Sequence, residues 1–191
     1  MRTKKEEILE AAFVVFSEKG YHRATVDEIV NLAATGKGTV YNYFSCKEGL
    51  FHAVIENQQD KLCRKLEGLV GRDTSLPTSI SDFIRIYLEF LVENSQLWRT
   101  MVGDPGAGRE KIRRKELIRR RFLRVVSVAE QILEKGQTRG DVQFDDLKLA
   151  GRLLVNMIHA SALHGEPDEP LDELTEKLTR LYLYGVSSRL T

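Results

Sequence analysis

The chain has few cysteines, no long apolar run and no recognisable targeting segment. Only two cysteines, Cys46 and Cys63, occur in 191 residues, too few for a disulfide framework, so we expect a reducing, cytoplasmic setting. No apolar stretch approaches the roughly 18–20 residues that cross a bilayer, so we expect no membrane partner. Cys46 is expected to be an inert thiol, and the alternative is a redox switch.

The chain also lacks an excess of charge of either sign. It has 29 Lys and Arg against 28 Asp and Glu, a formal net charge of +1. Residues 1–47 hold seven basic and six acidic residues. Attraction to a nucleic acid would therefore have to come from individually placed cations rather than from a polycationic surface.

Catalytic motifs are missing as well. There is no G-x-S-x-G elbow, no phosphate-binding glycine loop and no H-E-x-x-H, and the glycines within 103–108 follow no predicted strand. We therefore expect no enzyme, no cofactor and no metal ion. His159 and His164 have no acidic or cysteine partner at ligand spacing, so we expect structural histidines, with metal binding or pH sensing as the alternative.

Helical periodicity is present almost everywhere, and no segment shows sustained strand alternation, so we predict an all-α fold. A capping box of Thr3 and Glu6 opens the first helix, which Gly20 ends. A second pair of Ser45 and Glu48 is expected to open a longer helix in the same way. Further helices are predicted over 77–94, 145–165 and 171–190.

Residues 25–44 read as a helix-turn-helix. Thr25 and Glu28 have capping-box spacing, and apolar residues then recur at three- and four-residue steps. In the turn, we expect Gly36 to take backbone angles denied to other residues. A second helix follows from about Lys37 to Phe44, and the alternative is an ordinary helical hairpin.

The surface left on this motif suits DNA. Threonine and asparagine can hydrogen-bond base edges or backbone, tyrosine hydroxyls donate to phosphates, and Gly38 has no side chain to hold the duplex away. The residues predicted to contact DNA are Thr25, Thr35, Lys37, Gly38, Thr39, Tyr41, Asn42, Tyr43 and Lys47.

The amino-terminal part resembles the DNA-binding domain of the TetR (tetracycline repressor-like) family of bacterial regulators. The matching segments are Ile8-Leu9-Glu10-Ala11-Ala12, Lys19-Gly20-Tyr21, Thr25-Val26 with Ile29, Lys37-Gly38-Thr39-Val40-Tyr41, Tyr43-Phe44 and Lys47-Glu48. The chain departs from the family pattern at Ala34-Thr35-Gly36, where Gly, Val and Ser are commoner, and Cys46 replaces a usual Ser. The resemblance implies a three-helix DNA-binding domain over 2–62 and a helical effector-binding and dimerisation domain over 77–191.

The resemblance also implies an effector pocket among the central helices, for a small and largely apolar molecule. Its candidate walls are Phe83, Tyr87, Phe90, Trp98, Met101, Phe122, Met157 and His159. Aromatic residues and methionine at helical spacing are equally typical of plain core, which is the alternative.

The last two helices look suited to pairing with a second copy, because TetR-like proteins dimerise through a four-helix bundle. The predicted interface residues are Leu147, Leu154, Met157, Ile158, Leu174, Leu178, Leu181 and Tyr182. An ordinary core within one chain is the alternative.

Together these features predict a homodimeric repressor that binds a palindromic operator in double-stranded DNA and that an effector releases. An activator, or a regulator without an effector, stays open. A different class of function would be a helical scaffold that binds partners through residues 109–124. This segment contains nine Lys or Arg and only two Glu. A solvated helix face carrying Arg113, Arg120 and Arg124 is the plainer interpretation of that run, and binding of an anionic ligand, such as an acyl-CoA head group, is a further alternative.

Overall fold

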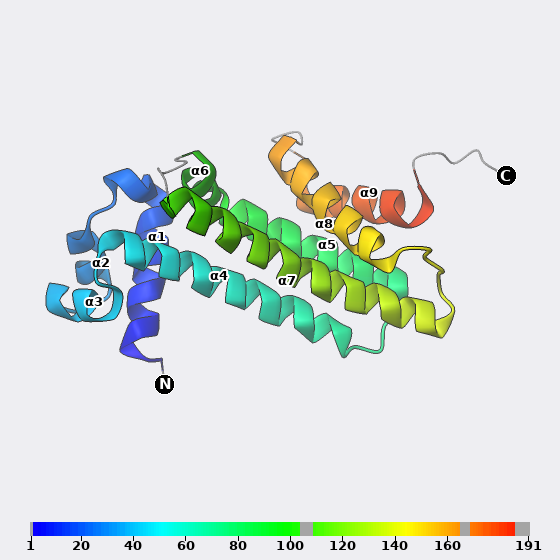
Figure 1. Cartoon of the computed structure of the whole chain (residues 1–191), viewed down its shortest axis with the longest axis horizontal. Coiled ribbons are helices and arrows are strands. Elements are labelled where there is room, and N and C mark those ends of the chain that lie inside the picture. Colours follow the sequence, from blue (N-terminus) through cyan, green and yellow to red (C-terminus); the bar gives the residue numbers. More distant parts are fainter. Residues whose placement is uncertain (1, 104–108, 165–168, 186–191) are drawn as a thin grey trace. The chain divides into compact units, whose positions relative to one another are not determined.

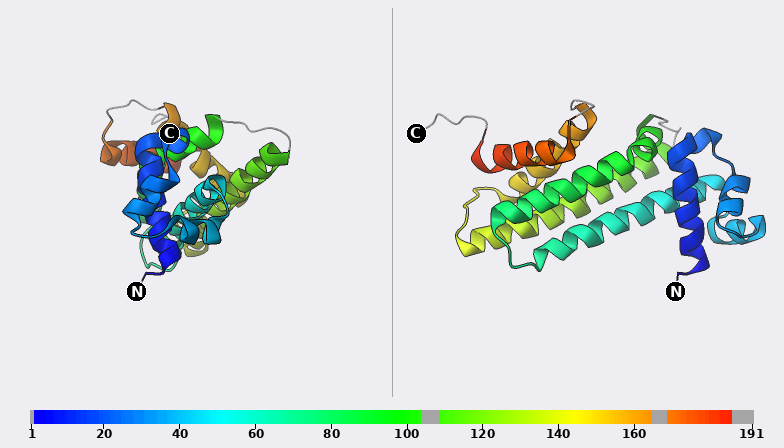
Figure 2. Two further views of the ribbon diagram at one scale, coloured as in Figure 1. Left: turned by 90° about the vertical axis from the view of Figure 1, so that its left-hand side faces the viewer. Right: turned by 180° about the vertical axis from the view of Figure 1, so that it is seen from behind.

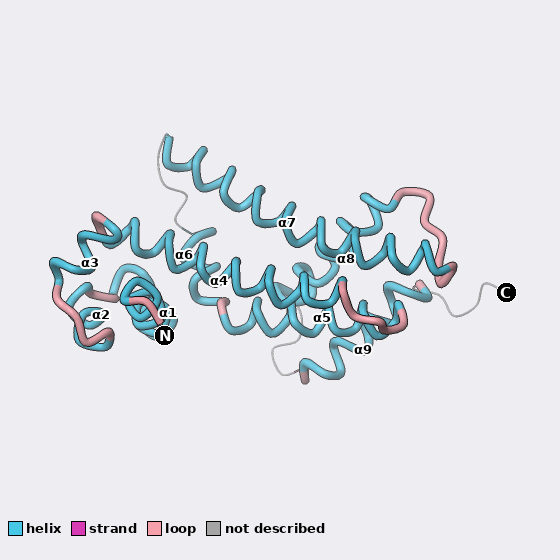
Figure 3. The backbone as a smooth tube through the Cα atoms, turned by 90° about the horizontal axis from the view of Figure 1, so that it is seen from below, coloured by secondary structure: helices cyan, strands magenta, loops and turns pink. Residues whose placement is uncertain are grey.

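The computed structural model describes residues 2–103, 109–164 and 169–185; of the side chains in these ranges, those of 100–103, 109–115, 117 and 164 are not described. Most of the described residues are helical, and none of them lies in a strand (Figures 1 and 3). This confirms the predicted all-α fold. The helices are α1 (Lys4–Arg23), α2 (Val26–Leu32), α3 (Lys37–Phe44), α4 (Lys47–Val70), α5 (Leu76–Glu93), α6 (Ser95–Gly103), α7 (Arg109–Arg139), α8 (Leu147–His164) and α9 (Leu171–Tyr184).

The helices form two compact units. The head unit comprises residues 1–61 and 94–111, and the body unit comprises 62–93 and 112–191. Our predicted division placed everything after residue 77 in the second domain. The packing groups α6 with the head instead, because α6 lies against α1. Helix α4 contributes residues to both units.

The head unit is built on local signals that the sequence carries. The Glu6 amide donates to Thr3 Oγ1 at 3.3 Å, and the Thr3 amide donates to Glu6 Oε2 at 2.8 Å, so the predicted capping box is present. Gly20 interrupts α1 with φ +73° before its last turn. Phe16 is fully buried and meets Phe51 of α4 edge to face, with ring centroids 5.2 Å apart.

The body unit is centred on α5, which packs against both α8 and α9 (Figure 2). Its fully buried side chains include Ile80, Phe83, Ile84, Leu88, Leu133 and Leu154. Lys135 of α7 closes the end of α4 by donating to the carbonyls of Val70 (3.0 Å) and Arg72 (2.6 Å). A Cβ at Gly151 would lie 2.8 Å from Cγ of Glu130, so this glycine serves the close approach of α8 to α7 of the same chain.

Candidate nucleic-acid interface

The start of α2 is a complete capping box. The Glu28 amide donates to Thr25 Oγ1 at 3.3 Å, and the Thr25 amide donates to Glu28 Oε2 at 2.9 Å. Lys19 also donates to Glu28, and these bonds, that from Lys19 above all, lower the pKa of Glu28 to about 2. The Thr25 hydroxyl therefore has a structural task beside any contact with DNA.

The turn between α2 and α3 differs from the prediction. The Thr35 amide donates to the Val30 carbonyl and the Ala34 amide to the Asn31 carbonyl, the two bonds of a Schellman motif. In that motif the residue after the C-cap takes positive φ, and this residue is Ala34, with φ +46°. Gly36 is instead extended, with φ −99°, and is the N-cap of α3 without a side-chain bond. The expectation that Gly36 takes the unusual angles was wrong.

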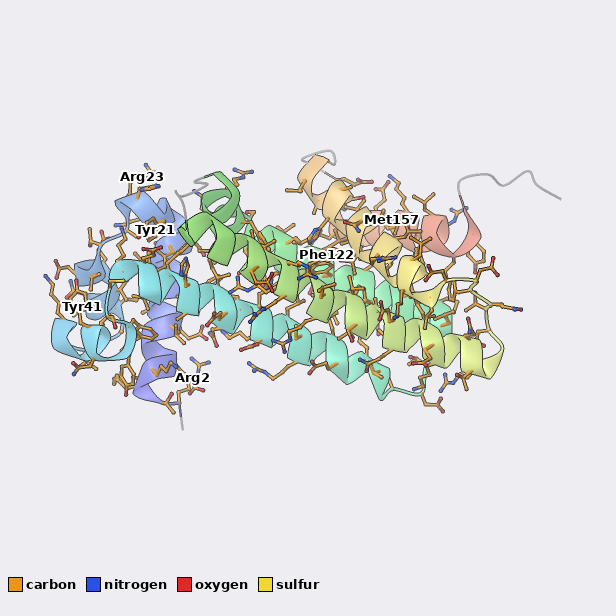
Figure 4. The ribbon with its side chains drawn as sticks, in the orientation of Figure 1. Arg2, Tyr21, Arg23, Tyr41, Phe122 and Met157 are labelled. Atoms are coloured by element: carbon orange, nitrogen blue, oxygen red, sulfur yellow. The ribbon has the colours of Figure 1, made fainter. Side chains whose placement is uncertain are left out.

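Helix α3 has the predicted bounds, with Val40 and Phe44 buried beneath it. Lys37, Gly38, Tyr41, Asn42 and Tyr43 are exposed, whereas Thr35 and Thr39 are half-buried. Figure 4 shows Tyr41 on this part of the head. No atom lies within 4 Å of a Cβ built on Gly38, so the helix start is open to an approaching backbone.

The two predicted lysine contacts are already engaged within the head. Lys37 Nζ lies 2.7 Å from Asp27 Oδ1, and this carboxylate raises the pKa of Lys37. Lys47 is half-buried, with Nζ 4.6 Å from the centroid of the Tyr21 ring and 3.4 Å from the His22 carbonyl oxygen to which it donates. Burial lowers the pKa of Lys47.

The start of α4 also departs from the sequence prediction. Ser45 follows α3 with φ +60° and does not cap α4. Cys46 takes that position, since the Gly49 amide donates to its Sγ at 3.3 Å. A Cβ at Gly49 would lie 2.3 Å from the Phe44 carbonyl oxygen, so this position has room only for glycine. The thiol thus takes the capping role that a hydroxyl oxygen fills at many helix starts.

Several residues predicted for the effector pocket do meet in the body unit. The Tyr87 hydroxyl of α5 hydrogen-bonds His159 Nε2 of α8, and Phe83, Phe90 and Phe122 have ring centroids 6.1–6.4 Å from one ring of this pair. Burial raises the pKa of Tyr87 and lowers that of His159, so the bond joins two neutral groups.

Three pocket candidates remain: Trp98, Met157 and Met101. Trp98 belongs to α6 in the head unit. Met157 is half-buried on α8, and Figure 4 labels it there with Phe122 on α7. The side chain of Met101 lies outside the described residues.

The predicted dimer residues divide into two groups. Leu154, Ile158 and Leu178 are buried within the single chain, so they have no surface left to bury against a second copy. Tyr182 donates to the Ala150 carbonyl at 3.0 Å and also serves this core. Leu147, Met157 and Leu174 are half-buried, and Leu181 is exposed.

Of the apolar residues that α8 and α9 leave exposed, the sequence analysis named Leu181 and missed the others. We name these exposed residues the outer leucine face: Leu149, Leu153, Leu163, Leu181 and Tyr184. Leu153, Leu163 and Tyr184 have 56%, 74% and 72% of their surface exposed. The signal that could have found them is a second helical stripe on α8, at positions 149, 153, 160 and 163.

The basic run on α7 is largely a solvated face where its side chains are described. Arg119, Arg120 and Arg124 are exposed, and Glu116 pairs with the first two. Arg121 is buried. The side chain of Arg113 lies outside the described residues, as does that of His164.

None of the helices in the described part of the chain is both long enough and apolar enough to traverse a bilayer. The described residues also contain no group of three or more His, Cys, Asp or Glu arranged to hold a metal ion.

Comparison with known proteins now connects this geometry to a family. The model of the bacterial regulatory proteins of the tetR family matches residues 8–54. The HTH-type transcriptional regulator YfiR of Bacillus subtilis (strain 168) is 30% identical over 189 residues, covering 96% of this chain and 91% of YfiR. YvdT of the same strain, also an HTH-type transcriptional regulator, is 38% identical over 81 residues, 42% of each chain.

A solved structure shares the fold of the whole chain. FadR from Bacillus subtilis, a transcriptional regulator in complex with stearoyl-CoA, superposes with a TM-score of 0.75 at 20% identity. The match covers 95% of this chain and 99% of that one. With the helix-turn-helix geometry and the full-length similarity to YfiR, these matches show that the chain belongs to the TetR family of bacterial transcriptional regulators, with its DNA-binding domain at the amino end.

Proposed function

We propose that this chain is a homodimeric repressor whose two heads bind a palindromic operator, and that a small, largely apolar effector releases it. The observation that carries the proposal is the exposed face of α3. Tyr41, Asn42 and Tyr43 are exposed there beside the open backbone of Gly38, while Val40 and Phe44 anchor the helix from beneath.

This face combines the two kinds of contact that a specific DNA-binding protein needs. Asn42 can bond a base edge, and the tyrosine hydroxyls can donate to phosphates, which position the helix without reading sequence. Two heads related by a two-fold axis would read half-sites about one helical turn apart. We expect a specific Kd of roughly 10⁻⁸–10⁻¹¹ M at physiological salt.

The test is retention of DNA by two variants, after selection of bound duplexes from random sequence with the full-length protein. Y41F/N42A removes two contacts of α3, and R120Q/R124Q removes two exposed charges of α7. Because one specific contact contributes about 1–3 kcal/mol, the first variant should bind the selected duplex at least about tenfold more weakly. The second should bind like the wild type. The reverse pattern would favour a scaffold that uses residues 109–124.

For the dimer, the outer leucine face is the surface that supports the proposal. Monomeric proteins rarely leave several large apolar side chains exposed in one contiguous patch. Leu149, Leu153 and Leu163 lie along one stripe of α8. Leu181 and Tyr184 of α9 add further exposed apolar surface. A two-fold pair of such helices would make an isologous interface.

For the effector, we propose a molecule with a long acyl chain that binds at the aromatic cluster of the body. Phe83, Phe90 and Phe122 supply apolar walls, and the Tyr87–His159 pair supplies the polar groups that orient a ligand. The structural similarity to FadR, which was solved with stearoyl-CoA, supports this class. Stearoyl-CoA should release the selected duplex, whereas CoA without an acyl chain should not.

Coupling between effector and DNA would pass through α4, which contributes residues to both units. An effector that bound both states of the protein equally would change nothing. To empty an operator it must prefer the state that cannot bind DNA by several kcal/mol.

A further inference from the structure

Asp27 lies where a carboxylate is unfavourable for a protein that binds DNA. It is in the first turn of α2, and its Oδ1 lies 2.7 Å from Nζ of Lys37, the first residue of α3. Both side chains are well exposed, with 65% and 56% of their surface accessible. Lys37 is one of the residues predicted to contact DNA, and the DNA group that attracts a lysine ammonium is a phosphate.

Asp27 is not part of the capping box that begins α2. The Thr25 hydroxyl and the Glu28 carboxylate already complete the capping box between themselves. Glu28 is further held by Lys19. Asp27 instead pairs with Lys37 at the start of α3, across the turn of the helix-turn-helix.

The charge of Lys37 is consequently balanced before DNA arrives. A phosphate must either displace Asp27 from the ammonium group or accept a pair with almost no net charge. An exposed ion pair contributes little to the stability of the fold. The main effect of this pair is therefore to weaken the attraction of Lys37 for an approaching anion. Each phosphate that a cation neutralises releases counterions. It makes the slope of log K for DNA binding against log salt concentration more negative by about 0.9.

We propose that Asp27 restrains Lys37 and so reduces the sequence-independent part of DNA binding by the head. This inference rests on the proposed DNA-binding face. Contacts to phosphate strengthen binding to every sequence alike, whereas base contacts distinguish sequences. By weakening one phosphate contact, Asp27 limits the binding of the regulator to the large excess of non-operator DNA.

The experiment measures binding of the full-length protein to a selected duplex and to a scrambled duplex over a range of salt concentrations. D27N keeps the shape of the side chain and removes its charge. It should steepen the salt slope by about 0.9 for each head bound, and so by about 1.8 for a two-fold pair. The gain in affinity at low salt should be several-fold and equal on both duplexes, because a phosphate contact carries no sequence information.

Two controls separate this effect from general electrostatics. D82N makes the same charge change at another exposed ion pair, that of Asp82 with Arg72 in the body unit, 3.3 Å apart, and should leave the slope unchanged. In a K37Q background, D27N should lose its effect on the slope. Thermal unfolding of each variant checks that the fold is intact.

The results distinguish this inference from the proposed function. A wild type that retains neither duplex at low salt would overturn both. If the wild type binds, the inference fails when D27N leaves the slope unchanged, when D82N changes it equally, or when D27N acts as strongly without Lys37.

Discussion

At the scale of single residues, the head keeps many of its charges paired. Lys4 pairs with Glu7, Lys19 with Glu28, Lys37 with Asp27 and Lys61 with Glu10. Each pair is substantially exposed, so its contribution to stability is small. In the proposed function, these pairs reduce the positive field that the phosphates of DNA meet.

His159 gives a prediction about pH. Burial lowers the pKa of His159 from the ordinary 6.5. As the pH falls, this histidine is therefore protonated at a higher pH in the unfolded chain than in the folded one. His159 should therefore cause no loss of stability above about pH 6.5. The free energy of unfolding should fall as the pH drops from 6.5 towards the lowered pKa of His159. The measurement is urea unfolding between about pH 5 and 7.5.

Two histidine variants provide the comparison for this effect. H159Q should remove most of the pH dependence in that interval, because glutamine does not titrate. H22Q, at an exposed histidine of the head unit, is the matched control. The carboxylates with lowered pKa, such as Glu28, titrate further down, below their ordinary 4.5. A profile for H159Q as steep as that of the wild type would contradict the assignment.

At the scale of the element, the turn between α2 and α3 shows what local pattern can and cannot give. The capping box at Thr25 and the bounds of α3 were predicted correctly, because each depends on residues three or four apart. The residue in the left-handed region was not. The position is defined by where α2 stops, and the only glycine nearby, Gly36, lies two residues too late.

We therefore expect A34G to stabilise the protein. Positive φ destabilises a non-glycine residue by about 1–2 kcal/mol, and glycine removes this strain. Glycine also loses more backbone entropy on folding, which costs about 0.5–1 kcal/mol, so the net stabilisation should be about 0.5–1 kcal/mol. The matched control is A33G, since Ala33 has φ −80° and should lose about 1 kcal/mol on the same change. Chemical unfolding of the two variants and the wild type measures both changes. A loss of stability in A34G similar to that in A33G would refute the explanation.

Helix α8 illustrates the limit of periodicity. Leucines lie on two sides of it, with Leu154 buried against its own chain and Leu149 and Leu153 exposed. A helical pattern identifies apolar stripes but does not say which one packs within the chain. The same limit applies to the start of α4, where both Ser45 and Cys46 could cap and only the path of the turn selects Cys46.

At the scale of the whole molecule, the central prediction is that the outer leucine face joins two copies. L153E places a charge in the middle of the α8 stripe. Burying an unpaired carboxylate there would cost about 2–5 kcal/mol, so the dimer should dissociate at least about thirtyfold more readily. Sedimentation velocity over a dilution series measures this directly.

The matched control is another exposed leucine on a different helix. Leu123 of α7 lies outside the outer leucine face, and L123E should leave the association state unchanged. If L153E and L123E sediment alike as dimers, the interface lies elsewhere. If the wild type is a monomer at the concentrations that bind DNA, the homodimer proposal is wrong.

The sequence by itself determined the fold class, the two capping boxes, the bounds of α3 and the kinship of the head, because all of these rest on short-range spacing along one helix or turn. Only the tertiary structure decided that Ala34 takes positive φ, that Cys46 caps α4, that α6 packs with the head, and which stripe of α8 faces outward. It also decided that Asp27 meets Lys37. The first two depend on the residue at which α2 and α3 end, and the others depend on how separate helices approach one another; the spacing of apolar residues along one helix specifies neither.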